Sequence, residues 1–464
     1  MKKLLLTVIA AAFIFASCAG NAERQDANTA SGNEAADTAG ISSESTPESA
    51  SEGAAEGVPA GNEELYRAML EAWEDGRISE MYGYASVELK AVIDEDAFTQ
   101  IFDGMTETFG SITAYSDGAR TASAGYDIYI CHVQLAHAKA DFTLTFKNTQ
   151  IAGTNYDLRF TDTFEKQYEN GVTERYFLLQ SGDYELNAVY TYCQADKAPA
   201  VLLISGSGPN DYNETVGLLT PFKDIALGLA EEGVNSLRFE KRTLRYPHEF
   251  TAKYGLDEEY FDDCRAAVLY LSGQEETDGI FLLGHSLGGQ AAAVLANETG
   301  AKGLILFSSS PRHLADIAAD QMIAADPAKK EQYEAYAKAA KEAAEDTAKG
   351  LNYYSATDYY WADYNRINVT EMLKDAGVPV LVINSRADLQ IFDTDIEQWQ
   401  EKLSDADNVT IRIYDDLSHF GYRINAADTA QLYRKADFPE ELITDFSEFI
   451  KAFPLGDGDS EGIG

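Results

Sequence analysis

Ser286 stands in a Gly-x-Ser-x-Gly pattern that follows an apolar run and precedes a helix-like segment. The pattern lies within residues 281–289, FLLGHSLGG. The two glycines permit a sharp turn that lifts the serine hydroxyl out of the end of a strand. We therefore predict that Ser286 is a nucleophile. The backbone N–H of Leu287, at the start of the helix, is expected to stabilise an oxyanion.

A serine hydroxyl attacks well only when a base removes its proton. For a serine on a strand-to-helix turn, the expected chain order is serine, acid, histidine. Only His313 and His419 follow Ser286 in the chain, and His285 is adjacent to the serine and poorly placed to fold back on it. His313 lies shortly after the apolar run that ends at Phe307, where an insertion begins, whereas His419 lies in a loop after the alternating segment 409–414. Position and order favour His419 as the base.

The acid that orients the histidine is expected at the end of another strand. Residues 378–388, VPVLVINSRAD, form an apolar run that leads into a loop with one carboxylate, Asp388. Asp388 would accept the imidazole N–H, fix the tautomer and stabilise the imidazolium. Asp393 and Asp395 are alternatives, although both also suit the cap of a following helix.

A second oxyanion donor is expected in the loop that follows the early apolar run 200–204. That loop, residues 205–211, reads SGSGPND, and its small residues allow the backbone to come close to a substrate. We assign the donor to the N–H of Ser207. The alternative interpretation of the loop is a tight turn without a catalytic role.

Elements that could position these groups alternate between strand and helix from about residue 165 to 455. The expected strands are 200–204, 234–239, 279–283, 303–307 and 379–383, and the expected helices are 222–232, 264–271 and 290–296. Strands spaced by helices favour an α/β fold with a mostly parallel sheet covered on both faces. In such sheets functional groups gather at the carboxyl ends of the strands.

A long insertion separates the strand ending at Phe307 from the strand beginning at Pro379. Residues 315–349 are rich in Ala, Lys and Glu, which predicts helix, and residues 312–370 are expected to form a helical cap. An aromatic cluster follows, which could line an acyl pocket or pack the cap against the core. Its members are Tyr353, Tyr354, Tyr359, Tyr360, Trp361 and Tyr364.

Together these motifs resemble bacterial serine esterases of the α/β-hydrolase fold, in the serine aminopeptidase-like group. The matching segments are SGSGPND at 205–211, LRFEKR at 237–242, GHSLGG at 284–289, DLQI at 388–391 and LSH at 417–419. The resemblance implies hydrolysis of small carboxylic esters, with short acyl chains, through Ser286, His419 and Asp388 and an acyl-enzyme. It implies no metal and no organic cofactor. A peptidase or amidase on the same triad, or a non-catalytic binding lipoprotein, are the alternatives.

A small α+β domain is expected at residues 62–162. Leu65, Met69 and Trp73 share one helix face. Two later segments alternate as strands do, with Tyr126, Ile128, Ile130 and His132 on one side of the first and Phe142, Leu144 and Phe146 on one side of the second. The segment looks like helix-plus-sheet domains that precede some bacterial hydrolases. A structural role is expected for His132 and His137.

The N-terminus has the features of an export signal. Lys2 and Lys3 precede an apolar stretch at 4–15, and small residues then lead to Cys18, which resembles the lipobox of bacterial lipoproteins. We expect a signal peptide at 1–18, lipidation of Cys18 and an extracytoplasmic protein anchored to a bacterial membrane. An ordinary signal peptide is the alternative. Residues 19–61 are expected to form a disordered acidic linker and 456–464 a flexible tail.

The overall charge argues against a nucleic-acid partner. The chain has 36 Lys and Arg against 77 Asp and Glu, for a net charge of -41, and such a surface repels phosphates. Beyond Cys18 the chain has Cys131, Cys193 and Cys264. Three thiols form at most one disulfide, and we expect them to act as small apolar residues. The sequence leaves the oligomeric state open.

Overall fold

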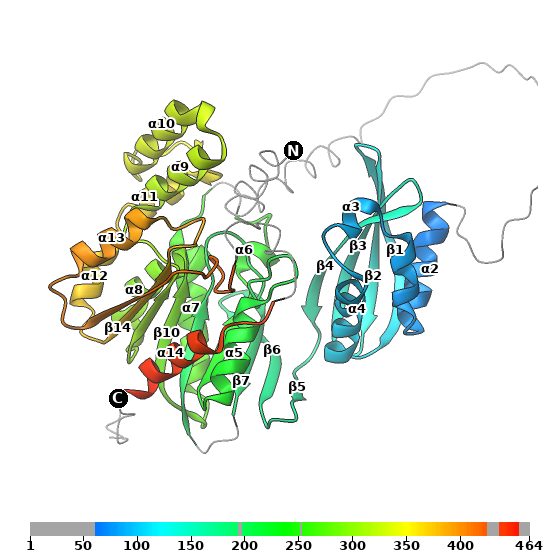
Figure 1. Cartoon of the computed structure of the whole chain (residues 1–464), viewed down its shortest axis with the longest axis horizontal. Helices are drawn as coiled ribbons and strands as arrows, with labels where there is room; N and C mark the ends of the chain where they lie inside the picture. The colour runs from blue at the N-terminus through cyan, green and yellow to red at the C-terminus, as the bar shows by residue number, and fades with distance from the viewer. Residues whose placement is uncertain (1–60, 194–196, 251–252, 425–435, 454–464) are drawn as a thin grey trace, which may run out of the picture. The chain divides into compact units, whose positions relative to one another are not determined.

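The computed structural model describes residues 61–193, 197–250, 253–424 and 436–453 (Figure 1). The expected signal peptide with Cys18, all but the last residue of the expected linker, and the expected tail lie outside these residues. The described chain divides into two compact units, residues 61–158 and 159–453, here called the first and second unit. None of the described helices is long and apolar enough to cross a membrane.

The first unit consists of short helices followed by an antiparallel sheet. The helices are α2 (Asn62–Glu74), η1 (Ile78–Tyr84), α3 (Val87–Lys90) and α4 (Glu95–Phe109). The strands pair in chain order and are β1 (Ile112–Ser123), β2 (Tyr126–Leu135), β3 (Ala138–Lys147) and β4 (Gln150–Phe160). Trp73 of α2 packs against Phe102 of α4 and Phe142 of β3, so an aromatic core joins helices to sheet.

The burial of the first unit matches the expected helix face and one of the two expected strand faces. Leu65, Met69 and Trp73 are buried, as is the Phe142 side of β3. In β2 the deeply buried side carries Tyr129, Cys131, Val133 and Leu135, opposite to the side that includes Ile128 and Ile130. Because β2 has apolar residues on both faces, alternation alone did not indicate which face packs. Cys131, Cys193 and Cys264 are free thiols, and Cys131 and Cys264 are buried.

The second unit is built on a mixed sheet, nine-stranded in the described residues, with the order β15-β14-β11-β10-β8-β9-β7-β6-β5. Neighbours from β15 to β9 pair in parallel, and β9, β7, β6 and β5 pair antiparallel. The strands are β5 (Phe164–Gln167), β6 (Thr173–Ser181), β7 (Tyr184–Tyr192), β8 (Ala198–Ile204), β9 (Asn235–Phe239), β10 (Thr277–His285), β11 (Leu304–Phe307), β14 (Val380–Ser385) and β15 (Val409–Tyr414).

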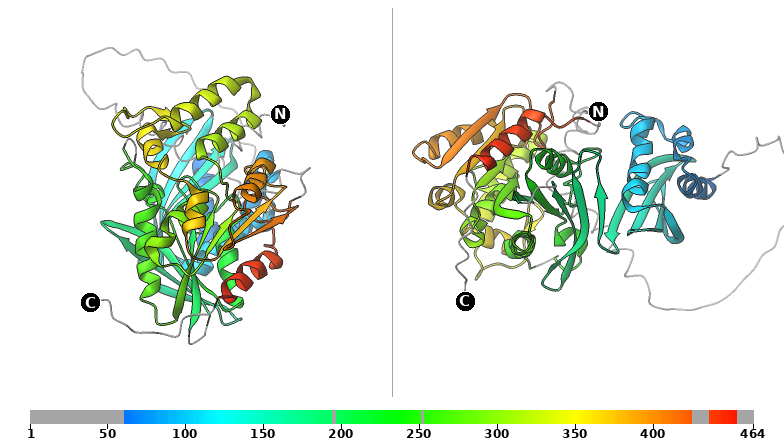
Figure 2. Two further views of the ribbon diagram at one scale, coloured as in Figure 1. Left: turned by 90° about the vertical axis from the view of Figure 1, so that its left-hand side faces the viewer. Right: turned by 90° about the horizontal axis from the view of Figure 1, so that it is seen from below.

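Helices cover both faces of this sheet (Figure 2). The helices along the sheet are α5 (Pro221–Glu231), α6 (Arg242–Arg245), η2 (Asp257–Phe261), α7 (Asp262–Ser272), α8 (Leu287–Thr299), α12 (Val369–Asp375), α13 (Asp393–Lys402) and α14 (Glu440–Lys451). Within β8, Leu203 faces a core shared with α5 and α14, whereas Leu202 faces a core shared with α7 and α8. The central strands are therefore apolar on both sides, as predicted for a buried parallel sheet.

The insertion after β11 forms a helical cap that is more broken than expected. Its elements are α9 (Leu314–Ala325), η3 (Pro327–Lys329), α10 (Lys330–Lys341), β12 (Asn352–Tyr353), β13 (Ala356–Thr357) and α11 (Asp358–Tyr364). The prediction of helix throughout 315–349 was wrong at two places. Pro327 lacks the N–H that would continue α9, and α10 ends at Lys341 in favour of turns.

The aromatic residues of the cap serve packing. Tyr360, Trp361 and Tyr364 of α11 are at most 3% exposed and belong to the core shared with α8. The Trp361 indole N–H donates to the Tyr353 carbonyl at 2.9 Å. Of the two interpretations left open by the sequence, the structure supports packing between cap and sheet.

Candidate active site

Ser286 lies between β10 and α8 with φ 55° and ψ -120°, a conformation that L residues rarely adopt. The turn is tight on both sides. A Cβ on Gly284 would stand 2.1 Å from the Gly288 carbonyl oxygen, and one on Gly288 would stand 2.2 Å from the carbonyl oxygen of Ile204. Both glycines are therefore required by contact with neighbouring backbone, and the turn is pressed against the end of β8.

His419 and Asp388 form a hydrogen-bonded pair. His419 Nδ1 lies 2.8 Å from Asp388 Oδ2, and the two side chains are 6% and 0% exposed. The other carboxylate oxygen of Asp388 accepts from the N–H groups of Gln390 and Ile391, at 2.7 and 3.0 Å. Since a carboxylate only accepts, the Nδ1 of His419 carries the proton and its Nε2 is left as the basic atom.

His285, the residue before Ser286, bridges to the loop of His419. Its Nε2 lies 2.8 Å from the His419 carbonyl oxygen, and its Nδ1 lies 2.8 Å from Glu214 Oε1. The His285 and His419 rings are 4.7 Å apart between centroids. Burial disfavours the charged imidazole, but the Glu214 carboxylate outweighs it and raises the pKa of His285 above its ordinary value.

The loop after β8 lies against Ser286. A Cβ on Gly206 would stand 3.2 Å from Ser286 Cβ and 3.1 Å from Glu214 Oε1. The Gly206 N–H donates to the same Glu214 oxygen at 2.7 Å. Glu214 is buried and has φ 52°, so a strained residue holds this loop in place. Among the described residues the N–H groups of Ser207 and Leu287 donate no hydrogen bond, and both adjoin the serine turn.

The alternatives left open by the sequence have other partners. His313 caps α9, accepting from Ala315 N–H at 3.1 Å, and its Nε2 lies 2.8 Å from Asn365 Oδ1 within the cap. Asp393 is exposed and pairs with Arg386. Asp395 is fully buried but receives Arg312 at 2.7 Å and Ser310. The structure therefore brings His419 together with Asp388 and with none of these residues.

Four charged side chains at the end of β9 are buried, each with its own partner. The pairs are Arg238 with Glu174, Glu240 with Arg245, Lys241 with Glu259, and Arg242 with Asp263. In the sequence, this segment forms only part of a resemblance. No local pattern singles out Lys241 as a neighbour of the loop after β8, or Glu214 as a neighbour of His285, because these contacts join residues far apart in the chain.

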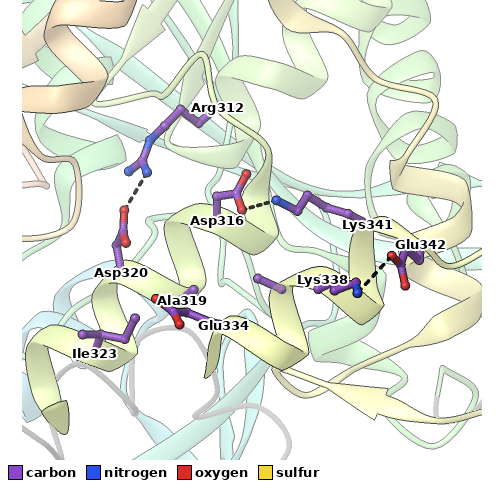
Figure 3. Close-up of a pocket in the computed structure, with 10 residues that line it drawn as sticks. Arg312, Asp316, Ala319, Asp320, Ile323, Glu334, Lys338, Lys341 and Glu342 are labelled. Atoms are coloured by element: carbon purple, nitrogen blue, oxygen red, sulfur yellow. Dashed lines mark hydrogen bonds and ion pairs between the residues drawn. The ribbon is translucent and has the colours of Figure 1, made fainter. Parts of the chain in front are cut away.

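A separate hollow of about 510 Å³ lies between α9 and α10 of the cap (Figure 3). It is lined by Arg312, Asp316, Ala319, Asp320, Ile323, Glu334, Ala337, Lys338, Lys341 and Glu342. Ion pairs join several of its lining residues, namely Arg312 with Asp320, Lys341 with Asp316, and Lys338 with Glu342. None of Ser286, His419 or Asp388 lines it.

Three features decide the architecture of the second unit. They are the order of the strands, the serine with positive φ between β10 and α8, and the His–Asp pair on the loops after β14 and β15. This unit has the α/β-hydrolase fold. The prediction of fold class is confirmed: a mostly parallel sheet carries a helical cap insertion, and a small α+β unit precedes it. From here on the second unit is called the hydrolase unit.

Comparison with known proteins finds similarity to one curated esterase and to several solved structures. The chain is 25% identical over 372 residues to esterase EstD of Thermotoga maritima, covering 78% of this chain and 88% of that protein. Est1E from Butyrivibrio proteoclasticus is a structural neighbour with TM-score 0.40 and 15% identity, over 60% of this chain and 99% of Est1E. The Pyrococcus horikoshii acylaminoacyl peptidase is another, with TM-score 0.42 and 14% identity, over 76% of this chain and 52% of the peptidase. No family model matches the chain.

Proposed function

We propose that the chain is a serine esterase that hydrolyses carboxylic esters of short acyl chains through Ser286, His419 and Asp388. The observation that carries the proposal is the buried His419–Asp388 pair, which leaves Nε2 of His419 as a base. This pair belongs to the hydrolase unit, in which Ser286 has the strained backbone conformation of a nucleophile elbow. The relative EstD, which is named an esterase, supports the same class of reaction.

The proposed reaction proceeds in two steps of acyl transfer. His419 Nε2 takes the proton of the Ser286 hydroxyl as Oγ attacks the ester carbonyl, and Asp388 stabilises the imidazolium that forms. The proton then passes to the leaving alcohol oxygen, which leaves an acyl-enzyme. In the second step His419 deprotonates water, water attacks the acyl carbon, and Ser286 regains its proton as the acid departs. The N–H groups of Leu287 and Ser207 stabilise both tetrahedral oxyanions.

The test is turnover of p-nitrophenyl acetate, butyrate and octanoate, and of an aminoacyl anilide, by the full chain and by Ser286→Ala. We expect ester turnover that falls with acyl length and disappears in the variant. Cleavage of the anilide alone would favour a peptidase. If neither substrate is turned over and a fluorophosphonate fails to label Ser286, the chain is instead a binding protein of this fold.

The proposal extends to location. Cys18, outside the described residues, follows an apolar stretch and small residues typical of a lipoprotein signal, and we propose that it is lipidated and holds the enzyme at the outer side of a bacterial membrane. In cells given labelled palmitate, the chain should carry label and sediment with membranes. Cys18→Ser should lose both properties, and a wild-type chain without label would refute the anchor.

A further inference from the structure

The carbonyl of Gly206 is held by two buried side chains. Lys241 Nζ donates to this oxygen at 2.6 Å and the Tyr260 hydroxyl donates to it at 2.7 Å. Asn210 Nδ2 adds a longer contact of 3.1 Å. This carbonyl belongs to the same planar peptide unit as the N–H of Ser207, so the two groups point in opposite directions and turn together.

Lys241 reaches this carbonyl from the end of β9 and is surrounded by polar and aromatic groups. Its side chain is 3% exposed and its Nζ lies 2.9 Å from Glu259 Oε1. The ammonium also lies 3.7 Å from the centroid of the Tyr260 ring. Burial lowers the pKa of Lys241 below its ordinary value, and the Glu259 carboxylate opposes that shift.

Glu259 contributes to the same loop. Besides pairing with Lys241, its Oε1 accepts from the Gly208 N–H at 3.3 Å. The peptide units on both sides of Ser207 are thus tied to one buried ion pair. An apolar pair of similar size would fill the same space without the cost of removing two charges from water, but it would leave the Gly206 carbonyl with fewer donors.

We propose that Lys241, assisted by Tyr260, is a positioning residue for the oxyanion hole: by holding the Gly206 carbonyl it aims the Ser207 N–H at the reacting carbonyl. The donors at the carbonyl also polarise the peptide, which strengthens its N–H as a hydrogen-bond donor. A stronger Ser207 N–H donor stabilises the substrate oxygen most when that oxygen becomes negatively charged. It therefore stabilises the transition state more than it strengthens substrate binding. This inference rests on the proposed esterase function.

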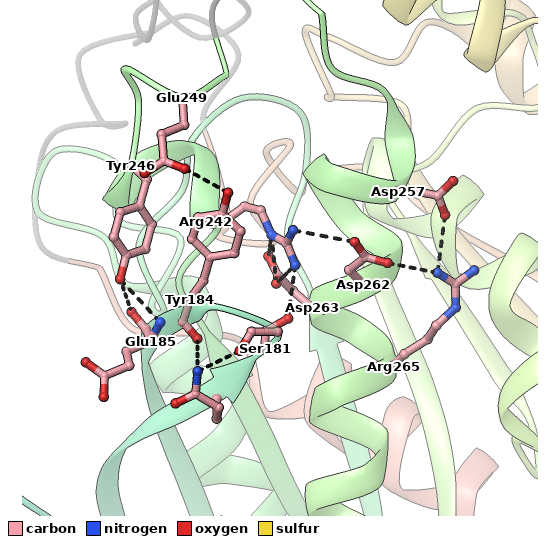
Figure 4. A network of polar contacts seen from close by, with 12 residues as sticks. Ser181, Tyr184, Glu185, Arg242, Tyr246, Glu249, Asp257, Asp262, Asp263 and Arg265 are labelled. Atoms are coloured by element: carbon pink, nitrogen blue, oxygen red, sulfur yellow. Dashed lines mark hydrogen bonds and ion pairs between the residues drawn. The ribbon is translucent and has the colours of Figure 1, made fainter.

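The test compares Lys241→Met with Arg242→Met in the full chain, using p-nitrophenyl butyrate. Arg242 is the matched control because it is the next residue, is equally buried and loses an ion pair of the same kind, with Asp263 at 2.5 Å (Figure 4). Its other neighbours include Ser181 at 3.0 Å and the Tyr184 ring. Among the described residues its guanidinium donates to Asp262, Asp263 and Ser181, and not to Gly206 or Ser207. Both variants are assayed at a temperature at which circular dichroism shows them folded.

We expect kcat of Lys241→Met to fall about 10- to 100-fold, while KM changes less than about threefold. Arg242→Met should keep kcat within about threefold of wild type although its melting temperature falls. Tyr260→Phe should show a smaller loss of kcat, and the double variant with Lys241→Met should lose less than the product of the two, because both side chains serve one carbonyl.

A second readout separates positioning from general loss of structure. An aryl trifluoromethyl ketone places an oxyanion in the hole, so its affinity should weaken in Lys241→Met by about the same factor as kcat, and should be unchanged in Arg242→Met. Equal losses of kcat in the two variants, or a loss confined to KM, would overturn the proposal. If Ser286→Ala retains wild-type turnover, the proposed reaction at Ser286 itself fails, and if the wild type turns over no ester, the esterase function fails; both results differ from a failure of the Lys241 proposal.

Discussion

His285 donates from its Nε2 to the backbone carbonyl of His419 across 2.8 Å. The residue before the proposed nucleophile therefore holds the main chain of the proposed base. The other nitrogen of the same ring faces Glu214, whose carboxylate also accepts the Gly206 N–H. One buried pair of side chains thus connects the serine turn, the histidine loop and the loop after β8, and each loop depends on it for its position.

This pair should make stability depend on pH. The folded-state pKa of His285 is raised above 6.5, so its contribution to the free energy of unfolding is complete below that value and is lost as the pH rises through the folded pKa. The groups around the ring are Glu214, His419 and, further away, Asp388. Melting temperatures of wild type and His285→Gln, measured from about pH 5 to about pH 9, should converge with rising pH. A constant difference would contradict the assignment.

Asp388→Asn should lower kcat by about 10³- to 10⁴-fold, because an amide favours the wrong tautomer of His419. Asp393→Asn is the matched control, since it makes the same change five residues later in an exposed side chain that pairs with Arg386. Its kcat should stay within about twofold of wild type, as expected for an exposed ion pair. Steady-state kinetics with p-nitrophenyl butyrate measure both, and a large loss in Asp393→Asn would transfer the acid role away from Asp388.

Gly288→Ala should disrupt the serine turn. The added methyl would stand 2.2 Å from the Ile204 carbonyl oxygen and 2.6 Å from that of Ser205, so β8 and α8 must separate. We expect a loss of about 2–4 kcal/mol in the free energy of unfolding, with turnover nearly abolished. Gly273→Ala, whose methyl would approach nothing closer than 3.5 Å, should change the free energy of unfolding and the turnover little. Urea unfolding followed by circular dichroism makes the comparison, and a fully stable Gly288→Ala protein would refute the contact.

Tyr364→Phe should loosen the cap. The Tyr364 hydroxyl donates to Gln290 of α8 and accepts from the Leu314 N–H at the start of α9. Gln290 in turn donates to the Ser310 carbonyl at 2.8 Å. Removing the hydroxyl leaves two buried groups without this partner, which costs about 1–3 kcal/mol of unfolding free energy.

Tyr359→Phe is the control for that change, because the Tyr359 side chain is only partly buried and its ring, with Lys253 above it, is kept. Chemical denaturation should separate the two variants. If Tyr364→Phe is as stable as Tyr359→Phe, the hydroxyl does not hold the cap.

Local patterns in the sequence predicted much of the hydrolase unit. The apolar runs of β8, β10, β11 and β14 stand out because central parallel strands are buried on both faces. The loops that follow such strands point to Ser286, Asp388 and His419. The strands β5, β6 and β7 were not predicted, since they join the sheet antiparallel through β9 and mix polar with apolar residues.

The supporting contacts could not be predicted in this way. Lys241 and Gly206 are separated by 35 residues, and Glu214 and His285 by 71. No spacing rule joins residues so far apart, and a buried Lys or Glu is the exception among charged side chains. Their partners become visible only when the sheet brings the ends of β8, β9 and β10 together.

The buried ion pairs at the end of β9 also determine how this segment tolerates mutation. The partners of Arg238, Glu240, Lys241 and Arg242 lie 64, 5, 18 and 21 residues away. A single neutral substitution leaves an uncompensated buried charge and costs about 3–5 kcal/mol, whereas replacing both members by apolar residues is often neutral. A double-mutant scan should therefore show strong positive epistasis within each pair. For Lys241 and Glu259, replacing both residues by apolar ones should restore the abundance of the folded protein without restoring turnover. Such a result would show that Lys241 is needed for catalysis separately from folding.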